Sequence, residues 1–188
     1  MIKKILVVIA AIILIPIAAV LVIAATKPDS FEIERAIRID AVPENIFPLI
    51  SDLRKFRTWS PYETKDPDMQ RTFTGPESGT GATYEWNGDE NIGQGQLQIV
   101  GAVEPSIVTM DLRFVRPFEV QNTVEFRIES EGQASNVTWT MRGPMPFISK
   151  VMSVFVDIDG MVGSDFEVGL ANLKALAERS SDLPATEG

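Results

Sequence analysis

The side chains that could bind a ligand include two aromatic residues in a charged loop. Trp59 and Tyr62 flank Pro61 within residues 54–67. Large aromatic rings gain free energy when they are removed from water, so each ring needs a packing partner. We expect this loop at the mouth of an apolar cavity, with Trp59 and Tyr62 as its lid or wall. The alternative is that Trp59 plugs one end of the core.

Other aromatic and sulfur-containing side chains fall on alternating positions of strands or on the apolar stripe of the last helix. Alternating residues share one face of a strand, so they can line the same space. The alternative is plain packing within a core. The candidates for cavity lining from these elements are Tyr84, Trp86, Trp139, Met141, Phe155 and Met161.

Three polar residues fall in otherwise apolar patterns. Asn122 shares a strand face with Val124, and Arg35 shares one with Ile33, while Asp165 lies near the edge of a helical apolar stripe. A buried polar group without a partner costs about 1–3 kcal/mol. These residues are therefore predicted to anchor the polar part of a mostly apolar ligand. The alternatives are exposure at the rim or an internal Arg35–Asp165 ion pair.

The composition excludes several kinds of chemistry. The chain has 188 residues, no cysteine and no histidine. It therefore has no disulfide, cysteine nucleophile, Ser-His-Asp triad or common zinc site, and we expect no metal and no cofactor. The net charge of −9 gives nucleic-acid binding little electrostatic support. Any catalysis would use carboxylate, Lys, Arg or Tyr side chains.

The N-terminal segment, 1–26, reads as a membrane anchor. Lys3 and Lys4 precede an apolar run over residues 5–25. As a helix this run would extend about 31 Å, close to the ~30 Å hydrocarbon core of a bilayer. The lysines predict an N-terminus in the cytoplasm and the remaining domain on the outer, periplasmic or extracellular side. A signal peptide is the alternative.

The rest of the chain predicts one α+β domain over residues 27–180, followed by a flexible tail over 181–188. A strand over 31–40 precedes a short or interrupted helix that contains Pro48. Between residues 69 and 143, alternating patterns separated by glycine and proline predict six strands. They comprise 69–75, 81–88, 93–105, 106–115, 119–129 and 135–143.

Residues 146–178 switch to a helical period and carry one apolar stripe, with a bend suggested by Gly160 and Gly163. A run of antiparallel strands must bury one face, and this stripe is the only one of matching length. We therefore predict a curved antiparallel sheet around a long C-terminal helix.

Several stretches of the sequence resemble the START-like superfamily, in particular its polyketide cyclase/dehydrase and lipid transport branch. The resemblance covers about 31–178. It rests on the segment IDAVPENIF, the Trp59-Ser60-Pro61 loop, the strands NTVEF and VTWTM, and the helix ending in DFEVGLANLKALAE. It implies a helix-grip fold with a hydrophobic cavity between the sheet and the long helix. Members bind lipids, hormones, polyketides or other apolar molecules, and a minority are enzymes.

Three functions remain open at this point. The first is a membrane-anchored domain that binds an apolar small molecule or lipid. The second is an enzyme of the cyclase or hydrolase type that uses Tyr, Arg and carboxylate groups, although no catalytic set can be mapped. The third is a non-catalytic envelope interaction protein whose cavity is filled by core side chains.

Overall fold

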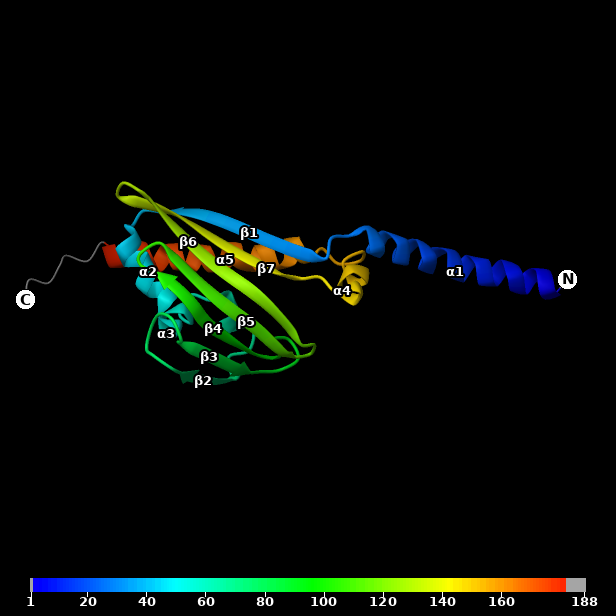
Figure 1. Ribbon diagram of the computed structural model, residues 1–188, viewed down its shortest axis with the longest axis horizontal. Helices are drawn as coiled ribbons and strands as arrows, with labels where there is room; N and C mark the ends of the chain where they lie inside the picture. The colour runs from blue at the N-terminus through cyan, green and yellow to red at the C-terminus, as the bar shows by residue number, and fades with distance from the viewer. Residues whose placement is uncertain (1, 182–188) are drawn as a thin grey trace, which may run out of the picture.

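The computed structural model describes residues 2–181 (Figure 1). Its helices are α1 (Ile2–Thr26), α2 (Pro43–Ser51), α3 (Leu53–Phe56), the 3-10 helix η1 (Pro61–Thr64), α4 (Phe147–Met152) and α5 (Ile158–Ser181). Its strands are β1 (Ser30–Ile39), β2 (Gln70–Thr74), β3 (Thr83–Asn87), β4 (Gln94–Val103), β5 (Ile107–Arg116), β6 (Val120–Glu131) and β7 (Ala134–Pro144). The predicted tail, apart from its first residue, lies outside the described residues.

The seven strands form one antiparallel sheet in the order β1-β7-β6-β5-β4-β3-β2. Strands β2 to β7 pair with their neighbours in sequence, as expected from the short turns between the alternating segments. Strand β1 closes the order by pairing with β7, in a register that places Arg35 opposite Trp139. Trp139 in turn lies opposite Phe126 of β6. The register therefore brings residues from the start, middle and end of the chain onto one face.

Helix α5 covers this face along β1 and β7, and α2 packs between α5 and strands β5 and β6 (Figure 1). The buried side chains of both helices and of the inner strand positions form a single core. The α+β helix-grip architecture, with an antiparallel sheet and a C-terminal helix, is confirmed. We call the region where α2 and α3 meet α5 the closed end, and the region beside α4 the α4 end.

The C-terminal helical segment differs from the prediction because it is two helices. Helix α4 ends at Met152, and α5 begins at Ile158. The Asp157 carboxylate accepts a hydrogen bond from the backbone N–H of Gly160 at 2.9 Å, which caps the start of α5. An apolar stripe can continue across such a break, because the stripe reports only which positions are apolar. The break therefore falls before Gly160 and not between Gly160 and Gly163.

The membrane anchor predicted for residues 5–25 is wrong. A crossing needs ~20 consecutive, predominantly apolar residues, and none of the helices within residues 2–181 satisfies the combined requirement of length and apolar character. The predicted single-pass topology, and the localisation that was derived from it, are therefore wrong as well. Helix α1 extends away from the sheet and meets the rest of the protein at α4 (Figure 1). Lys27, just after α1, donates from Nζ to the carbonyl oxygen of Ser153 at 2.8 Å.

Candidate functional site

An aromatic cluster fills the space between the sheet and α5 at the closed end. Its members come from α3, the following turn, β6, β7 and α5: Phe56, Trp59, Phe126, Trp139 and Phe166. The rings of Trp139 and Phe166 stack with centroids 4.0 Å apart, and Phe56 meets Trp59 edge-on at 4.6 Å. Rings packed at these distances leave no room for a ligand among them. Trp139, predicted as a cavity-lining residue, is thus part of the packed core.

Trp59 lies within this cluster and is only 1% exposed. Its indole Nε1 donates to the carbonyl oxygen of Leu49 at 2.8 Å. Its own carbonyl oxygen accepts a hydrogen bond from Asn172 Nδ2 of α5 at 3.1 Å. The indole N–H and the carbonyl oxygen of Trp59 therefore join α2 and α5 across the core. This is the position of a core plug rather than that of a lid.

Tyr62, the second aromatic residue of the loop, lies on η1 at the side of the core. It is partly buried and packs against the core residues, and Lys65 Nζ lies 5.1 Å from the ring centroid. Burial of the hydroxyl, together with the nearby carboxylate of Asp165, raises the pKa of Tyr62 above its ordinary range. The hydroxyl therefore stays protonated at neutral pH.

Burial on the inner face of the sheet decreases from the closed end toward the α4 end. On β5, Val108 and Met110 are fully buried, whereas Leu112 and Phe114 are only partly buried. Phe31, at the start of β1, is also partly buried and packs against the core. An interior that loses cover along several strands at once is open on that side. The inner face is therefore less completely covered at the α4 end than at the closed end.

Asn122 lies on the inner face of β6 at the α4 end, and it is only 6% exposed. Its Oδ1 is buried and has no hydrogen-bond partner among the described residues. Gly143 of β7 provides the space for this amide, because a Cβ at position 143 would lie 2.0 Å from Asn122 Oδ1.

The indole Nε1 of Trp139 is the second buried side-chain polar atom without a partner in the described part of the chain. Met141 lies on the same face of β7 between Trp139 and Gly143 and is buried.

Apolar side chains are exposed around the α4 end. Phe155 is 72% exposed and Met161 is 57% exposed, although both were predicted to line the cavity. Phe155 lies in the connection between α4 and α5, and Met161 lies on a face of α5 other than the one that buries Phe166 and Leu170. Further exposed apolar side chains at this end are Phe147, Ile148, Met152 and Val156.

Arg35 pairs with other carboxylates than the predicted Asp165. Its Nη2 lies 3.1 Å from Asp159 Oδ2 and its Nε lies 3.1 Å from Glu167 Oε1. Residues four apart on a helix share a face, so positions 159, 163 and 167 of α5 all face β1. Gly163 lies between the two carboxylates and leaves room for the guanidinium group, since a Cβ there would meet Arg35 Nη2 at 2.0 Å. Asp165 lies on another face and binds Lys65 Nζ at 2.6 Å.

Tyr84 and Trp86 lie on the inner face of β3, near the edge of the sheet. The Tyr84 ring stacks on Phe73 at 4.9 Å, and its hydroxyl donates to Glu63 Oε1 at 2.6 Å. Burial and this hydrogen bond raise the pKa of Tyr84 above its ordinary range. Trp86 donates from Nε1 to the carbonyl oxygen of Ile92 at 3.2 Å. Tyr84 is thus bound to η1, and Trp86 is bound to the connection between β3 and β4.

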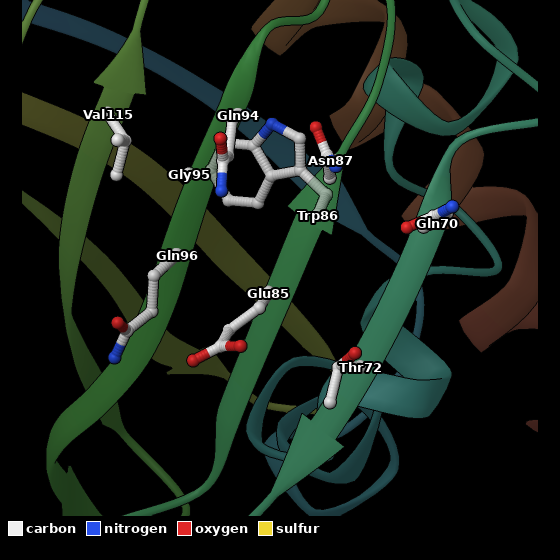
Figure 2. Close-up of a pocket in the computed structure, with 9 residues that line it drawn as sticks. All are labelled: Gln70, Thr72, Glu85, Trp86, Asn87, Gln94, Gly95, Gln96 and Val115. Carbon is white, nitrogen blue, oxygen red and sulfur yellow. The ribbon is translucent and has the colours of Figure 1, made fainter.

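Two hollows lie at this edge of the sheet. The first measures about 240 Å³ and crosses the outer faces of β2, β3 and β4, where Figure 2 shows a row of polar side chains with the Trp86 ring beside Gly95. The second measures about 400 Å³ and lies between α3, η1 and β2, where it is lined by Arg54, Arg57, Thr58, Glu63, Pro67 and Arg71. Sequence reasoning missed both. The only available signal was the spacing of Arg54 and Arg57, which places both on one side of a helical turn.

Comparison with known proteins agrees with this architecture. The family model described as polyketide cyclase / dehydrase and lipid transport matches residues 30–178. A search of curated proteins found no match to this chain.

Several solved structures share the fold at low sequence identity. Protein MLL2253 from Mesorhizobium loti is 14% identical with a TM-score of 0.57, and the match covers 82% of this chain and 99% of that one. The Aha1 dimer from Colwellia psychrerythraea is 16% identical with a TM-score of 0.56, covering 79% and 96%. CalU16 from Micromonospora echinospora is 14% identical with a TM-score of 0.53, covering 83% of each chain. The chain belongs to the polyketide cyclase/dehydrase and lipid transport family.

Proposed function

We propose that the chain binds a small apolar molecule or lipid at the α4 end of the grip, with a hydroxyl or other donor group of the ligand bound to Asn122 Oδ1. The proposal refines what the family suggests, which is a ligand-binding domain. The observation that carries it is the buried Asn122 Oδ1 without a partner. A buried acceptor left unpaired costs about 1–3 kcal/mol, and a ligand donor would remove that cost.

The surroundings of Asn122 support a ligand with a mostly apolar body. Phe31, Leu112 and Phe114 pack only partly against the core on this side. Small-molecule sites combine such apolar walls with a few polar groups that orient the ligand. The exposed apolar side chains of α4 and of the connection to α5, including Phe155, would border the entrance. Of the residues proposed from the sequence, Asn122 and Met141 are thus the best placed for contact with a ligand.

A competition experiment tests the hydrogen bond to Asn122 directly. The full-length chain would be titrated with the uncharged fluorescent probe 1-aminoanthracene, which 1-decanol and its methyl ether would then displace. The alcohol carries a donor and the ether does not. We expect the alcohol to compete about three- to tenfold better, as one neutral hydrogen bond predicts. In the Asn122→Leu variant the two competitors should become equal.

The control is Asn136→Leu, the same substitution at a partly buried position of the neighbouring strand β7. Side chains along a strand point to opposite faces in turn, and position 136 is three residues from Trp139, so it lies on the other face of the sheet. This variant should keep the preference for the alcohol. Equal competition by the alcohol and the ether in the wild-type chain would contradict the proposed hydrogen bond between Asn122 and the ligand. Failure of the probe to bind at all would remove the ligand site.

A second candidate, a non-catalytic interaction protein, is favoured by the aromatic cluster. Stacking of Trp139 on Phe166 at 4.0 Å fills the closed end with side chains. The exposed side chains of Phe155 and Met161 would then contact a protein and not border an entrance. Native mass spectrometry of the purified full-length chain separates the two functions. A copurified small molecule supports the ligand site, and its absence together with failed probe binding supports the interaction protein.

A further inference from the structure

We propose that the hollow between α3, η1 and β2 is a second binding site, which takes an oxyanion, namely the phosphate or carboxylate group of a small molecule. We call it the arginine hollow and define it by Arg54, Arg57, Thr58, Glu63, Pro67 and Arg71. It is built from α3, η1, β2 and the adjoining loops, whereas Asn122 lies on β6, and so it does not depend on the ligand site proposed above.

The first argument is the balance of charge within the arginine hollow. Three arginine side chains line it, and Glu63 is the only acidic side chain among the lining residues. The chain as a whole carries a net charge of −9. A local excess of positive charge on an acidic protein attracts anions to that one place. The nearby Asp66 does not line the hollow, and its carboxylate accepts the backbone N–H groups of Asp68 and Asp89.

The second argument is the arrangement of Glu63 and Arg71, which form the floor of the arginine hollow. Both side chains already have hydrogen-bond partners within the protein. Glu63 is only 12% exposed, and its Oε2 lies 2.8 Å from Arg71 Nε. Its Oε1 accepts the hydroxyl of Tyr84 at 2.6 Å. Arg71 also donates to the carbonyl oxygens of Pro67 and Met69 at 3.1 and 2.6 Å. These bonds fix the floor, and they leave Arg71 as a positioning residue that contributes charge.

The third argument is the set of hydrogen-bond donors on Arg54 and Arg57, which form the walls of the arginine hollow. Arg57 contacts Glu63 through Nε at 3.2 Å, so that its two terminal nitrogens keep their N–H groups for another acceptor. The guanidinium group of Arg54 lies 4.9 Å from the ring centroid of Phe73 and, among the described residues, donates no hydrogen bond. Guanidinium groups bind phosphate and carboxylate oxygens through paired N–H groups.

The local fold holds these two walls side by side. Asp52 Oδ1 accepts the backbone N–H of Arg54 at 2.9 Å and caps α3 at its start. Arg54 and Arg57 are three residues apart on this turn and therefore project to the same side. Contact of Arg54 with Phe73, and of Arg57 with Glu63, orients both guanidinium groups before any anion arrives. Preorientation of this kind lowers the entropic cost of binding.

The test is calorimetric titration of the full-length chain with pyrophosphate and, separately, with citrate. The measurements are made at low ionic strength, where charge interactions are least screened. We expect binding of at least one anion. Each of Arg54→Gln and Arg57→Gln should weaken it by about tenfold or more, as loss of a charged hydrogen bond predicts. Preference for pyrophosphate assigns a phosphate group to the natural ligand, and preference for citrate assigns a carboxylate.

The matched control is Arg113→Gln, which removes the same charge from an exposed side chain of β5 outside the hollow. Its affinity should stay within about twofold of the wild-type value, because the Coulomb energy between an exposed charge and an anion bound at another site is small in water. Circular dichroism checks that all variants fold. Absence of binding to both anions overturns the proposal. An equal loss in Arg113→Gln also overturns it, because only the overall charge would then matter. Neither result bears on the probe experiment at Asn122.

Discussion

The closed end and the α4 end of the grip use the same elements in opposite ways. At the closed end, Trp59 donates its indole N–H to the carbonyl oxygen of Leu49 and packs against neighbouring rings. At the α4 end, Asn122 Oδ1 is buried without a partner, and Phe155 is exposed. Each end also holds one buried side-chain atom without a partner among the described residues, Trp139 Nε1 in the aromatic cluster and Asn122 Oδ1 at the α4 end. The two ends therefore differ in how far neighbouring side chains cover the inner face, which is complete around Trp59 and partial around Leu112 and Phe114.

The largest effect is expected from Trp59→Ala at the closed end. Removal of this buried ring leaves a cavity in the aromatic cluster, so the free energy of unfolding should fall by ~3–5 kcal/mol. Urea unfolding of the full-length chain measures the change. Phe155→Ala is the matched control, since its ring is 72% exposed, and it should change stability by less than about 0.5 kcal/mol. Similar losses in both variants would break the contrast between the two ends.

A pair of glycine substitutions compares how rigid the two ends are. A Cβ at Gly169 would lie 2.7 Å from the Trp139 ring and 3.0 Å from Pro61 Cδ, neither of which can move easily. Gly169→Ala should therefore lose about 1–2 kcal/mol, since overpacking exceeds the gain in helix propensity. A Cβ at Gly143 would lie 2.0 Å from Asn122 Oδ1, which has no partner to hold it, and 2.9 Å from Cε1 of the partly buried Phe31 ring.

Gly143→Ala should consequently lose less than about 1 kcal/mol, because the amide can shift into the less covered space. Thermal unfolding of both variants under the same conditions gives the comparison. A greater loss at Gly143 than at Gly169 would show that the α4 end is packed as tightly as the closed end. The same Gly143→Ala variant should weaken probe binding if the amide occupies the ligand's space.

Acid should weaken one contact at the closed end through Glu178 of α5. Hydrogen bonds from Lys174 and from the backbone N–H of Asp40 lower the pKa of Glu178 below its ordinary value of 4.5. A lowered pKa means that the stabilisation is present above pH 4.5 and is lost as the pH falls through the lower, folded-state value. We expect a contribution of less than about 1 kcal/mol, because the group is partly solvated.

The measurement is the melting temperature of wild type and Glu178→Gln between pH 7 and pH 3. The variant should be less stable than wild type at pH 7, and the difference should shrink as the pH decreases. Asp29→Asn makes the corresponding change at the α4 end, where the hydrogen bond from Lys150 lowers the pKa of Asp29. A difference for Glu178→Gln that grows on acidification would contradict the assigned direction of the pKa shift.

The smallest effect is expected from removal of α1. We propose that residues 27–180 fold as an independent domain, because α1 makes its main contacts with α4. The fragment should unfold in one cooperative transition, with a melting temperature within a few degrees of the full-length value. Tryptophan fluorescence reports on the closed end during the same experiment. Aggregation of the fragment or a broad transition would show that α1 completes the α4 end.

Local patterns in the sequence were sufficient to predict the strands and the class of fold. Alternation of apolar and polar residues has the period of a strand, so β1 to β7 could be placed to within a few residues. Capping interactions were harder to recognise: a bend was predicted at Gly160 and Gly163, whereas the helix is interrupted just before Ile158. The apolar run in residues 5–25 suggested a membrane anchor, which is the main structural prediction that proved wrong.

The partners of polar side chains depended on the tertiary structure. An internal Arg35–Asp165 pair was one of the alternatives considered from the sequence, yet the face of α5 that meets β1 carries Asp159 and Glu167. The orientation of that face is set by packing over the whole helix. The arginine hollow joins residues from α3, η1 and β2 for the same reason. The sequence by itself determined which segments alternate and which chemistry is excluded, because these are local properties. Only the tertiary structure decided which polar atoms remain without a partner, because partners come from segments far apart in the chain.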